Sequence, residues 1–351
     1  MSRRLAEVAT KVGVSEATVS RVLNEKPGVA DATRQAVLTA LDVLGYERPT
    51  QLRGVRARLV GLVVPELQNP IFPALAEVVG GALVQLGFTP VLCTRTAGGL
   101  TEAEYVTMLL DQQVSGVVFC GGLSSEEYGQ LIGRGVPVVL LNAAVDYSEF
   151  SGSEITDKNL AGRHGFPHVS TDDEAAVEQA YSHLVALGHR TMGLLVGAAD
   201  HAPSRRKAEA FARLHAQSSQ PTSGRVAHAL FSFEGGQAAA AELLTAGATA
   251  LICGSDILAL GAIRAARRMN LNVPDDISVI GFDDSAMMNF TDPPLTTLRQ
   301  PIDAMARAAV TLLVNQIASG APTPKELLHE PELVVRGSTG PLRSLAAAAQ
   351  V

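Results

Sequence analysis

From Leu59 onward, short apolar runs alternate with stretches of helical periodicity, and this alternation limits the fold more than any other feature of the chain. The runs are continuously apolar, as is typical of parallel strands covered by helices on both faces of a sheet. They form two series of four: 59–64, 89–92, 116–119 and 137–141, then 191–196, 226–231, 249–253 and 277–282. A polar segment from Ala143 to Ser170 separates the series. The pattern predicts an α/β body of two doubly wound parallel-sheet lobes.

Sheets of this kind bind ligands beyond the carboxyl ends of their strands, so we expect a ligand site in the cleft between the lobes. The sequence has no Gly-x-Ser-x-Gly elbow, no Gly-x-x-x-x-Gly-Lys phosphate loop and no His-Glu-x-x-His pair. We therefore expect no enzyme, no cofactor and no metal site. Cys93, Cys120 and Cys253 each end a predicted strand, which is typical of small core residues rather than disulfides.

The first 46 residues have a different pattern, that of three short helices with Gly13 at the corner between the first two. Ser15 is a candidate N-cap for the second helix. Ala17, Ser20, Arg21 and Asn24 follow at i, i+3, i+4 and i+7, so they share one solvent-facing edge. Helical spacing alone leaves two interpretations open: a helix-turn-helix that inserts this edge into a DNA groove, or the solvated face of an ordinary three-helix domain.

Charge is divided unevenly along the chain. The net charge is −7, yet residues 1–58 hold ten Lys or Arg against six Asp or Glu. A basic head on an acidic body favours DNA binding by the head, although so modest an excess can also arise by chance. The chain starts without an apolar signal region, and no apolar run approaches the length of a membrane span. The expected location is cytoplasmic, with no membrane partner.

Three motifs make the chain resemble the lactose-repressor family of bacterial transcription regulators over nearly its whole length. They are Val14-Ser15-x-Ala17-Thr18-Val19-Ser20-Arg21-Val22-Leu23-Asn24 in the head, and residues 278–284 and 293–298 in the body. Within the family, residues 47–49, 64–72 and 332–338 look most like the regulators of maltose and maltodextrin operons. The resemblance implies lobes like those of periplasmic sugar-binding proteins, a homodimer, a pseudo-palindromic double-stranded DNA operator and a small saccharide effector.

The resemblance also implies which residues bind DNA: Leu5, Ser15, Glu16, Ala17, Thr18, Ser20, Arg21, Asn24, Leu52 and Val55. Arg21 can bind guanine through two hydrogen bonds, and Ala17 can contact a thymine methyl group. Glu16 either accepts from cytosine N4 or points away at the helix N-terminus. Leu52, with Val55 as second choice, is expected to wedge into DNA from a hinge that orders on binding, and a flexible linker is the alternative.

The effector contacts implied by the resemblance are Asn69, Phe72, Asn142, Arg206, Lys207, Ser255 and Asp283. Phe72 can stack on a sugar face, and Asp283 can accept hydrogen bonds from paired hydroxyls. Lys207 stands where sugar-binding members often have Arg, which puts the usual bidentate clamp in doubt. Asp256, rather than its neighbour Ser255, is expected to cap the following helix. Asn69 and Phe72 have a second interpretation, as a turn residue and a core aromatic.

The expected domains are a helix-turn-helix at 1–46, a hinge at 47–58, a first lobe at 59–166 with 294–319, a second lobe at 167–293 with 320–340, and a tail at 341–351. The predicted function is an operator-specific transcriptional repressor that a saccharide such as maltose or maltodextrin releases from DNA. The alternative is a cytoplasmic sugar-binding module whose head binds DNA or protein without specificity. The sequence encodes neither the effector's identity, nor its sign of action, nor the role of residues 143–167.

Overall fold

The computed structural model describes residues 8–23, 28–43, 58–94, 100–121, 134–143, 166–218, 222–319 and 326–342. The chain divides into two compact units, residues 1–58 and 59–351. In the part of the chain that is described, no helix is long and apolar enough to cross a membrane.

The first unit is helical, as predicted. It contains helical residues 8–12, α2 (Glu16–Leu23) and α3 (Asp31–Val43). Gly13 ends the first helical segment with φ of +74°, a left-handed conformation that glycine adopts without steric cost. Its N–H and that of Val14 both donate to the Ala9 carbonyl, at 2.9 and 3.0 Å. The buried core joins all three helices through Val8, Ala9, Val19, Val22, Val37 and Ala40.

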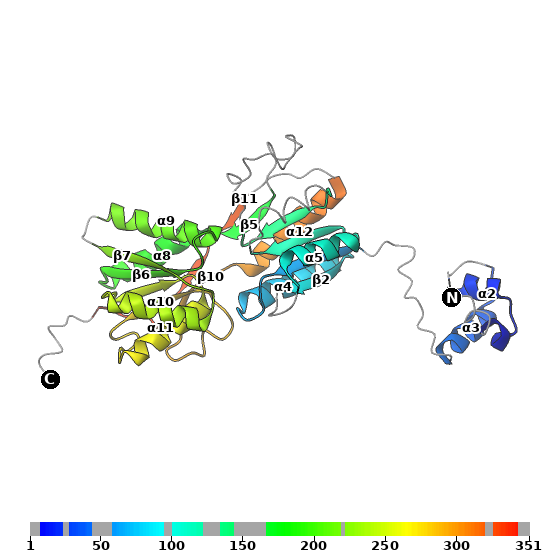
Figure 1. Ribbon diagram of the computed structural model, residues 1–351, viewed down its shortest axis with the longest axis horizontal. Helices are drawn as coiled ribbons and strands as arrows, with labels where there is room; N and C mark the ends of the chain where they lie inside the picture. The colour runs from blue at the N-terminus through cyan, green and yellow to red at the C-terminus, as the bar shows by residue number, and fades with distance from the viewer. Residues whose placement is uncertain are drawn as a thin grey trace, which may run out of the picture. The chain divides into compact units, whose positions relative to one another are not determined.

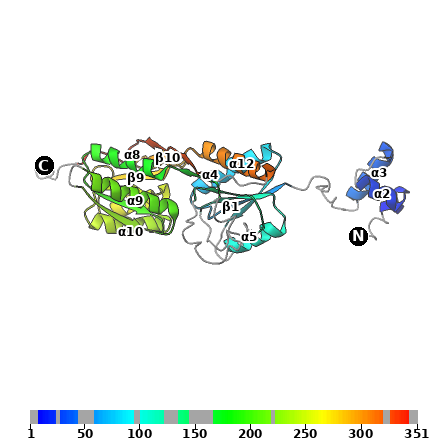
Figure 2. The same cartoon turned by 90° about the horizontal axis from the view of Figure 1, so that it is seen from above.

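The second unit contains two six-stranded sheets. The first sheet has the order β11-β5-β4-β3-β1-β2, and every pair in it is parallel. Its strands are β1 (Leu59–Val64), β2 (Thr89–Thr94), β3 (Gly116–Cys120), β4 (Val138–Leu141), β5 (His168–Thr171) and β11 (Glu326–His329). Helices α4 (Ile71–Gln85) and α12 (Ile302–Ser319) cover one face, and α5 (Glu102–Asp111) covers the other (Figure 2).

The second sheet has the order β12-β10-β9-β8-β6-β7, parallel except for the β10–β12 pair. Its strands are β6 (Thr191–Val196), β7 (Ser223–His228), β8 (Ala250–Cys253), β9 (Ser278–Asp283), β10 (Thr296–Arg299) and β12 (Glu332–Val334). Helices α8 (Asp173–Ala186) and α9 (Ala202–Gln217) pack on one face, and α10 (Phe233–Thr245) and α11 (Asp256–Arg268) on the other (Figure 1). The prediction of two doubly wound lobes is confirmed.

The chain crosses between the sheets at places other than the expected lobe boundaries. Strands β5 and β11 belong to the first sheet and β10 to the second, whereas the boundaries at 166/167, 293/294 and 319/320 assigned each of them to the other lobe. The polar segment marks a change of composition, but pairing decides membership: Leu140 and Leu141 of β4 pair with His168 and Val169 of β5. Each crossing therefore follows a strand and brings its last residues into the region between the lobes.

The three cysteines lie in the two cores. Cys93, Cys120 and Cys253 are buried at or near the carboxyl ends of β2, β3 and β8, and all three are free thiols. Burial raises the pKa of Cys120 to about 12, so its thiol stays protonated at neutral pH. The prediction that the cysteines are core residues is confirmed.

Candidate functional site

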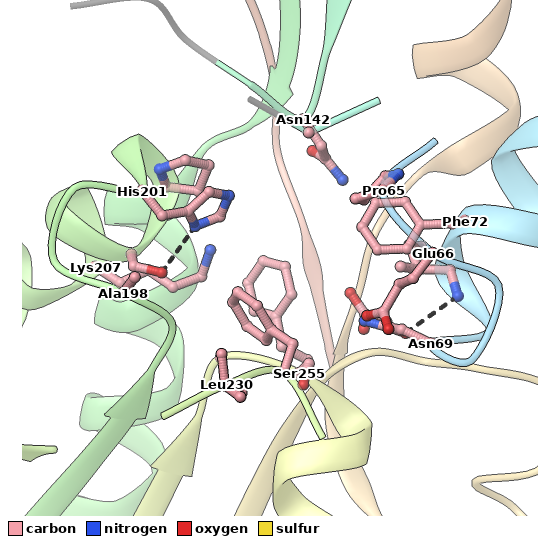
Figure 3. Close-up of a pocket in the computed structure, with 18 of the residues that line it drawn as sticks. Pro65, Glu66, Asn69, Phe72, Asn142, Ala198, His201, Lys207, Leu230 and Ser255 are labelled. Atoms are coloured by element: carbon pink, nitrogen blue, oxygen red, sulfur yellow. Dashed lines mark hydrogen bonds between the residues drawn. The ribbon is translucent and has the colours of Figure 1, made fainter. Parts of the chain in front are cut away.

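A cavity of about 690 Å³ lies between the two sheets of the second unit (Figure 3). Its walls come from segments that follow the carboxyl ends of strands in both sheets, as expected for parallel α/β lobes. Six of the seven predicted effector residues line it: Asn69, Phe72, Asn142, Lys207, Ser255 and Asp283. The volume is within the range of small-molecule sites, roughly 300 to 1,000 Å³.

The first lobe contributes an aromatic ring and amide groups to the cavity. Asn69 precedes α4, and its Oδ1 accepts a hydrogen bond from the backbone N–H of Ile71 at 3.3 Å. Phe72 packs against the core beneath α4 while its ring faces the cavity, opposite His201 and Lys207 (Figure 3). Asn69 therefore forms a turn and Phe72 contacts the core, and because both also line the cavity, their contact with an effector stays a prediction.

Gln300 joins the two lobes at the cavity, and sequence reasoning missed it. It follows β10 at the crossing to α12, and its Oε1 accepts from Asn142 Nδ2 at 2.8 Å and from Thr171 Oγ1 at 2.6 Å. Its Nε2 donates to Asp283 Oδ1 at 2.6 Å. One buried amide thus connects the ends of two first-lobe strands with a carboxyl of the second lobe. Gln300 lies where the chain passes from one lobe to the other, and no motif or residue spacing in the sequence marked that position.

Asp283 presents a buried carboxyl to the cavity. Its φ of +120° turns the chain out of β9, and the side chain is 4% exposed. Oδ1 accepts from Gln300, while Oδ2 has no hydrogen-bond partner within the described protein. Burial and the neighbouring Asp256 raise the pKa of Asp283 well above its ordinary value. A buried oxygen without a partner can bind a ligand hydroxyl, as an acceptor when the carboxyl is ionised and as a donor when it is protonated.

Asp256 lies close enough to Asp283 to raise its pKa, and it does not cap α11. Ser255 caps the helix instead, because its Oγ accepts from the Leu258 N–H at 3.3 Å. The Asp256 carboxyl accepts from Thr297 Oγ1 at 2.6 Å and from the Ser285 N–H at 2.7 Å. Burial raises the pKa of Asp256 to about 6. The expected cap was wrong by one residue, since the helix begins at Asp256.

Lys207 is buried beside the cavity and is neutralised there. Its Nζ pairs with Asp173 Oδ1 and lies 4.1 Å from the centroid of the Phe282 ring, a cation–π arrangement. Arg206 is not among the lining residues, because it is one position earlier on α9 and so points about 100° around the helix. Its Nε lies 3.2 Å from Asp173 Oδ2 and its Nη1 3.3 Å from Glu326 Oε1.

His201 and Phe231 form a second aromatic wall that the sequence analysis did not predict. Their ring centroids are 5.6 Å apart in an edge-to-face arrangement. His201 is the N-cap residue of α9, and its Nδ1 lies 2.9 Å from Ser204 Oγ. Burial, and then the charge of Lys207, lower the pKa of His201 to about 4, so the ring is neutral at neutral pH. The sequence did not mark His201 as a site residue, because a single histidine after a strand has no partner at a spacing typical of a binding or catalytic motif.

The predicted reading edge of the helical unit lies on the surface of α2. Ser15 Oγ accepts from the Thr18 N–H at 3.2 Å, as an N-cap does. Ser15, Glu16, Ala17, Ser20 and Arg21 are exposed, and Thr18 is half-buried. Glu16 is in the first turn of α2, where its charge complements the helix dipole. Leu5, Asn24, Leu52 and Val55 lie outside the described residues, as does most of the segment 143–167.

Comparison with known proteins accounts for both units. The family of bacterial regulatory proteins of the lacI type matches residues 4–49, and the periplasmic binding protein-like domain matches residues 181–339. The chain is 50% identical over 352 residues to the HTH-type transcriptional regulator reg1 of Streptomyces lividans, covering 97% of each chain. It is 49% identical over 351 residues to the HTH-type transcriptional regulator MalR of Streptomyces coelicolor, with the same coverage.

Solved structures of transcription regulators are similar to this chain over nearly its whole length. A transcriptional regulator CelR–cellobiose complex is similar with a TM-score of 0.70 and 30% identity, over 95% of this chain and 99% of that one. The lac repressor dimer bound to operator and the anti-inducer ONPF is similar with a TM-score of 0.71 and 27% identity, over 95% and 98%. These relatives are regulators by name, which confirms the expectation that the chain is not an enzyme.

Proposed function

The chain belongs to the lacI family of DNA-binding bacterial transcription regulators, and from that membership we propose that a small saccharide in the cavity between its lobes controls its affinity for an operator. The observation that carries the proposal is the meeting of Asn69, Phe72 and Asn142 from one lobe with Lys207 and Asp283 from the other. Flat aromatic rings beside acceptor groups suit a ligand that has apolar faces and many hydroxyls.

The proposed control is thermodynamic linkage. A saccharide that binds better to one arrangement of the lobes stabilises that arrangement by its differential affinity. If the head binds operator better in the other arrangement, saccharide and operator weaken each other by the same factor. We propose this sign, release of a repressor by its saccharide. Gln300 supports the coupling of ligand binding to the arrangement of the lobes, because its amide bonds groups of both lobes that face the same cavity.

For the effector itself we propose maltose or a maltodextrin. The support is the 49% identity to MalR over nearly the whole chain, together with the resemblance of residues 64–72 and 332–338 to maltose-operon regulators. Cellobiose is the second candidate, because a similar regulator is known in complex with it. The cavity volume of about 690 Å³ accommodates a disaccharide.

On the DNA side we propose a homodimer that binds a pseudo-palindromic operator through α2 of each copy. A two-fold dimer presents identical helices to two half-sites, and a similar repressor is known as a dimer on its operator. Ser15, Ala17, Thr18, Ser20 and Arg21 are the proposed contacts within the described part of the head. Leu5, Asn24, Leu52 and Val55 remain proposed contacts from outside it, and Glu16 is proposed to point away from the bases because phosphates repel it.

The test has two stages. A duplex selected from a random library by the purified full-length protein is titrated by fluorescence anisotropy against a scrambled duplex at several salt concentrations. We expect the selected duplex to bind at least about 1,000-fold more tightly. Maltose, maltotriose and cellobiose are then added, and at least one should lower the affinity for the selected duplex. Equal binding to both duplexes contradicts operator specificity, and a complex indifferent to every saccharide contradicts the effector proposal.

A matched pair of variants locates the DNA surface. Arg21→Ala removes a positive charge from α2, and Lys11→Ala removes one from the exposed side of helical residues 8–12. Loss of a bidentate contact to guanine costs about 1 to 3 kcal/mol and relaxes preference at one base pair. Arg21→Ala should therefore change the selected sequence, while Lys11→Ala should alter only affinity and its salt dependence. The opposite result places the reading edge elsewhere.

A further inference from the structure

We propose that Asp173 determines the specificity of the cavity: by neutralising Lys207, it makes the cavity accept uncharged saccharides and exclude their phosphorylated counterparts. The inference rests on the proposed function, because it concerns the ligand of the same cavity. It adds the charge class of that ligand and the residue that sets it. Asp173 was not among the predicted site residues.

The ammonium of Lys207 is fully engaged by the protein. It pairs with Asp173 Oδ1 on one side and lies over the Phe282 ring on the other. Lys207 is 6% exposed, so little of it remains for water or a ligand. Among the described residues that line the cavity, it is the one Lys or Arg. A phosphate that enters the cavity therefore has to compete with a buried carboxylate for its cation.

Carboxyl groups outnumber cations among the ionisable residues of the lining. Glu66 and Asp200 line the cavity beside Asp173, and no second cation among the described lining residues offsets them. His201 adds no positive charge, since burial and Lys207 lower its pKa to about 4. A dianionic phosphate meets like charges in a partly buried place, where repulsion is weakly screened. Sugar hydroxyls, in contrast, find hydrogen-bond acceptors in these carboxyls.

Arg206 does not replace Lys207 as an anion-binding group. Its guanidinium lies between two carboxylates, Asp173 Oδ2 at 3.2 Å and Glu326 Oε1 at 3.3 Å. Glu326 lies on β11 and also accepts from His168 Nε2 of the adjacent strand β5, at 3.0 Å. The arginine is thus neutralised outside the cavity by the first lobe. Asp173 is the group shared by both cations, and it is the carboxylate that pairs with Lys207, the cation that lines the cavity.

A purely structural role for Asp173 gives a different expectation. The carboxylate joins the first turn of α8 to α9, as the exposed pair Glu174 and Arg213 does one residue later at 2.9 Å. If Asp173 acts only as such a link, its neutralisation changes stability and leaves ligand selectivity as it was. If it sets the charge of the cavity, its neutralisation frees Lys207 and admits phosphorylated ligands. The ratio of two affinities separates these roles.

The experiment compares uncharged and phosphorylated members of matched pairs by isothermal titration calorimetry on the full chain. The probes are maltose with maltose 6′-phosphate and cellobiose with cellobiose 6′-phosphate. The wild type should bind the uncharged member of at least one pair at least about tenfold more tightly. Asp173→Asn should shrink that ratio at least about tenfold by strengthening phosphate binding. Glu174→Gln removes the adjacent charge outside the cavity and should keep the wild-type ratio.

A second variant covers the case in which Asp173→Asn does not fold, as judged by circular dichroism. Lys207→Met leaves the Asp173 carboxylate without its lysine, so the ratio should widen in favour of the uncharged sugar. An unchanged ratio in the variant that folds overturns the inference, because selectivity then arises from shape. Equal or tighter phosphate binding by the wild type overturns it while the saccharide proposal stands. If no saccharide of either kind binds, the proposed function fails, and this inference fails with it.

Discussion

The two lobes share one strand order but bring different chemistry to the cavity between them. In both, the sheet places its first strand between the second and third, and its last strand at the opposite edge. The first lobe supplies the uncharged side chains Asn69, Phe72 and Asn142, together with one half-buried carboxyl group, Glu66. The second supplies Asp283, Lys207 and the segments that hold Asp173 and His201. A common topology therefore fixes where a ligand binds, and the residues after each strand decide what each wall can do.

This difference has an energetic consequence. Ionisable groups in the second lobe are buried and hydrogen-bonded, so removing one leaves a partner unsatisfied. Neutral groups in the first lobe can separate from a ligand without leaving a charge unpaired. We therefore expect substitutions in the second wall to change stability and affinity more than those in the first, and five variants test this asymmetry.

The largest effect is expected in the pH dependence of stability. The folded protein keeps the Asp256 proton until about pH 6, whereas the unfolded chain releases it near pH 4. This contribution is therefore complete at low pH and is lost as pH rises through 6, by up to about 3 kcal/mol. Asp256→Asn should remove that slope, measured by urea unfolding between pH 4 and 7. Parallel pH profiles for wild type and variant would contradict it.

His201 gives a matched control of opposite sign in the same lobe. Its folded pKa of about 4 lies below its unfolded value near 6.5, so its contribution is complete above pH 6.5 and is lost as pH falls toward 4. The stability of His201→Gln should therefore fall less than that of the wild type as pH is lowered toward 4. The stability of Asp256→Asn should fall less than that of the wild type as pH is raised through 6. If both variants shift the profile in the same direction, the titrating groups are others.

The next effect concerns the affinity of the second wall for its ligand. Asp283→Asn keeps the positive φ, which Asn tolerates, and keeps the oxygen that accepts from Gln300. It replaces the unpartnered Oδ2 by an amide nitrogen that can only donate. We expect saccharide affinity to fall about 10- to 100-fold, because a ligand hydroxyl that donates to Oδ2 loses its acceptor in a buried site. Calorimetry with the effector measures this. Unchanged affinity would show that Asp283 binds the ligand as a protonated carboxyl, because its O–H and the Asn amide can both donate to the ligand.

A smaller effect is expected in the first wall. Phe72→Leu removes the ring that faces His201 and Lys207 but keeps an apolar contact with the core under α4. Loss of aromatic stacking costs about 1 kcal/mol, which corresponds to about fivefold in affinity. The same titration measures it, with thermal melting to check folding. A loss as large as that of Asp283→Asn would remove the difference between the walls.

The smallest effect is expected on the surface of the second lobe. Glu332→Gln breaks an exposed ion pair with Arg299 Nη1, whose length is 2.9 Å. Exposed pairs contribute about 0 to 1 kcal/mol, and Arg299 keeps its bond to Asp284 at 2.7 Å. The midpoint of urea unfolding should barely move, and saccharide affinity should stay the same. A larger change would mean that charge far from the cavity also contributes to the asymmetry.

Local patterns in the sequence carried much of the fold, and the family resemblance carried most of the predicted composition of the cavity. Continuous apolar runs predicted the strands, because both faces of a parallel sheet are buried. Gly13 and Ser15 marked the corner and the cap of the helical unit, since turn and cap geometry depend on neighbouring residues. Six predicted effector residues meet at one cavity because the ends of parallel strands lie at one edge of each sheet.

What the sequence by itself determined were properties set by neighbours along the chain: the apolar runs, the glycine corner, the basic head and the family motifs. Tertiary structure alone decided the contacts between segments far apart in the chain. Pairing assigned β5, β10 and β11 to their sheets, and it brought Gln300 within hydrogen-bond distance of Asn142 and Asp283. Burial then shifted the pKa values of Asp256 and His201, because the cost of a charge depends on its surroundings in space.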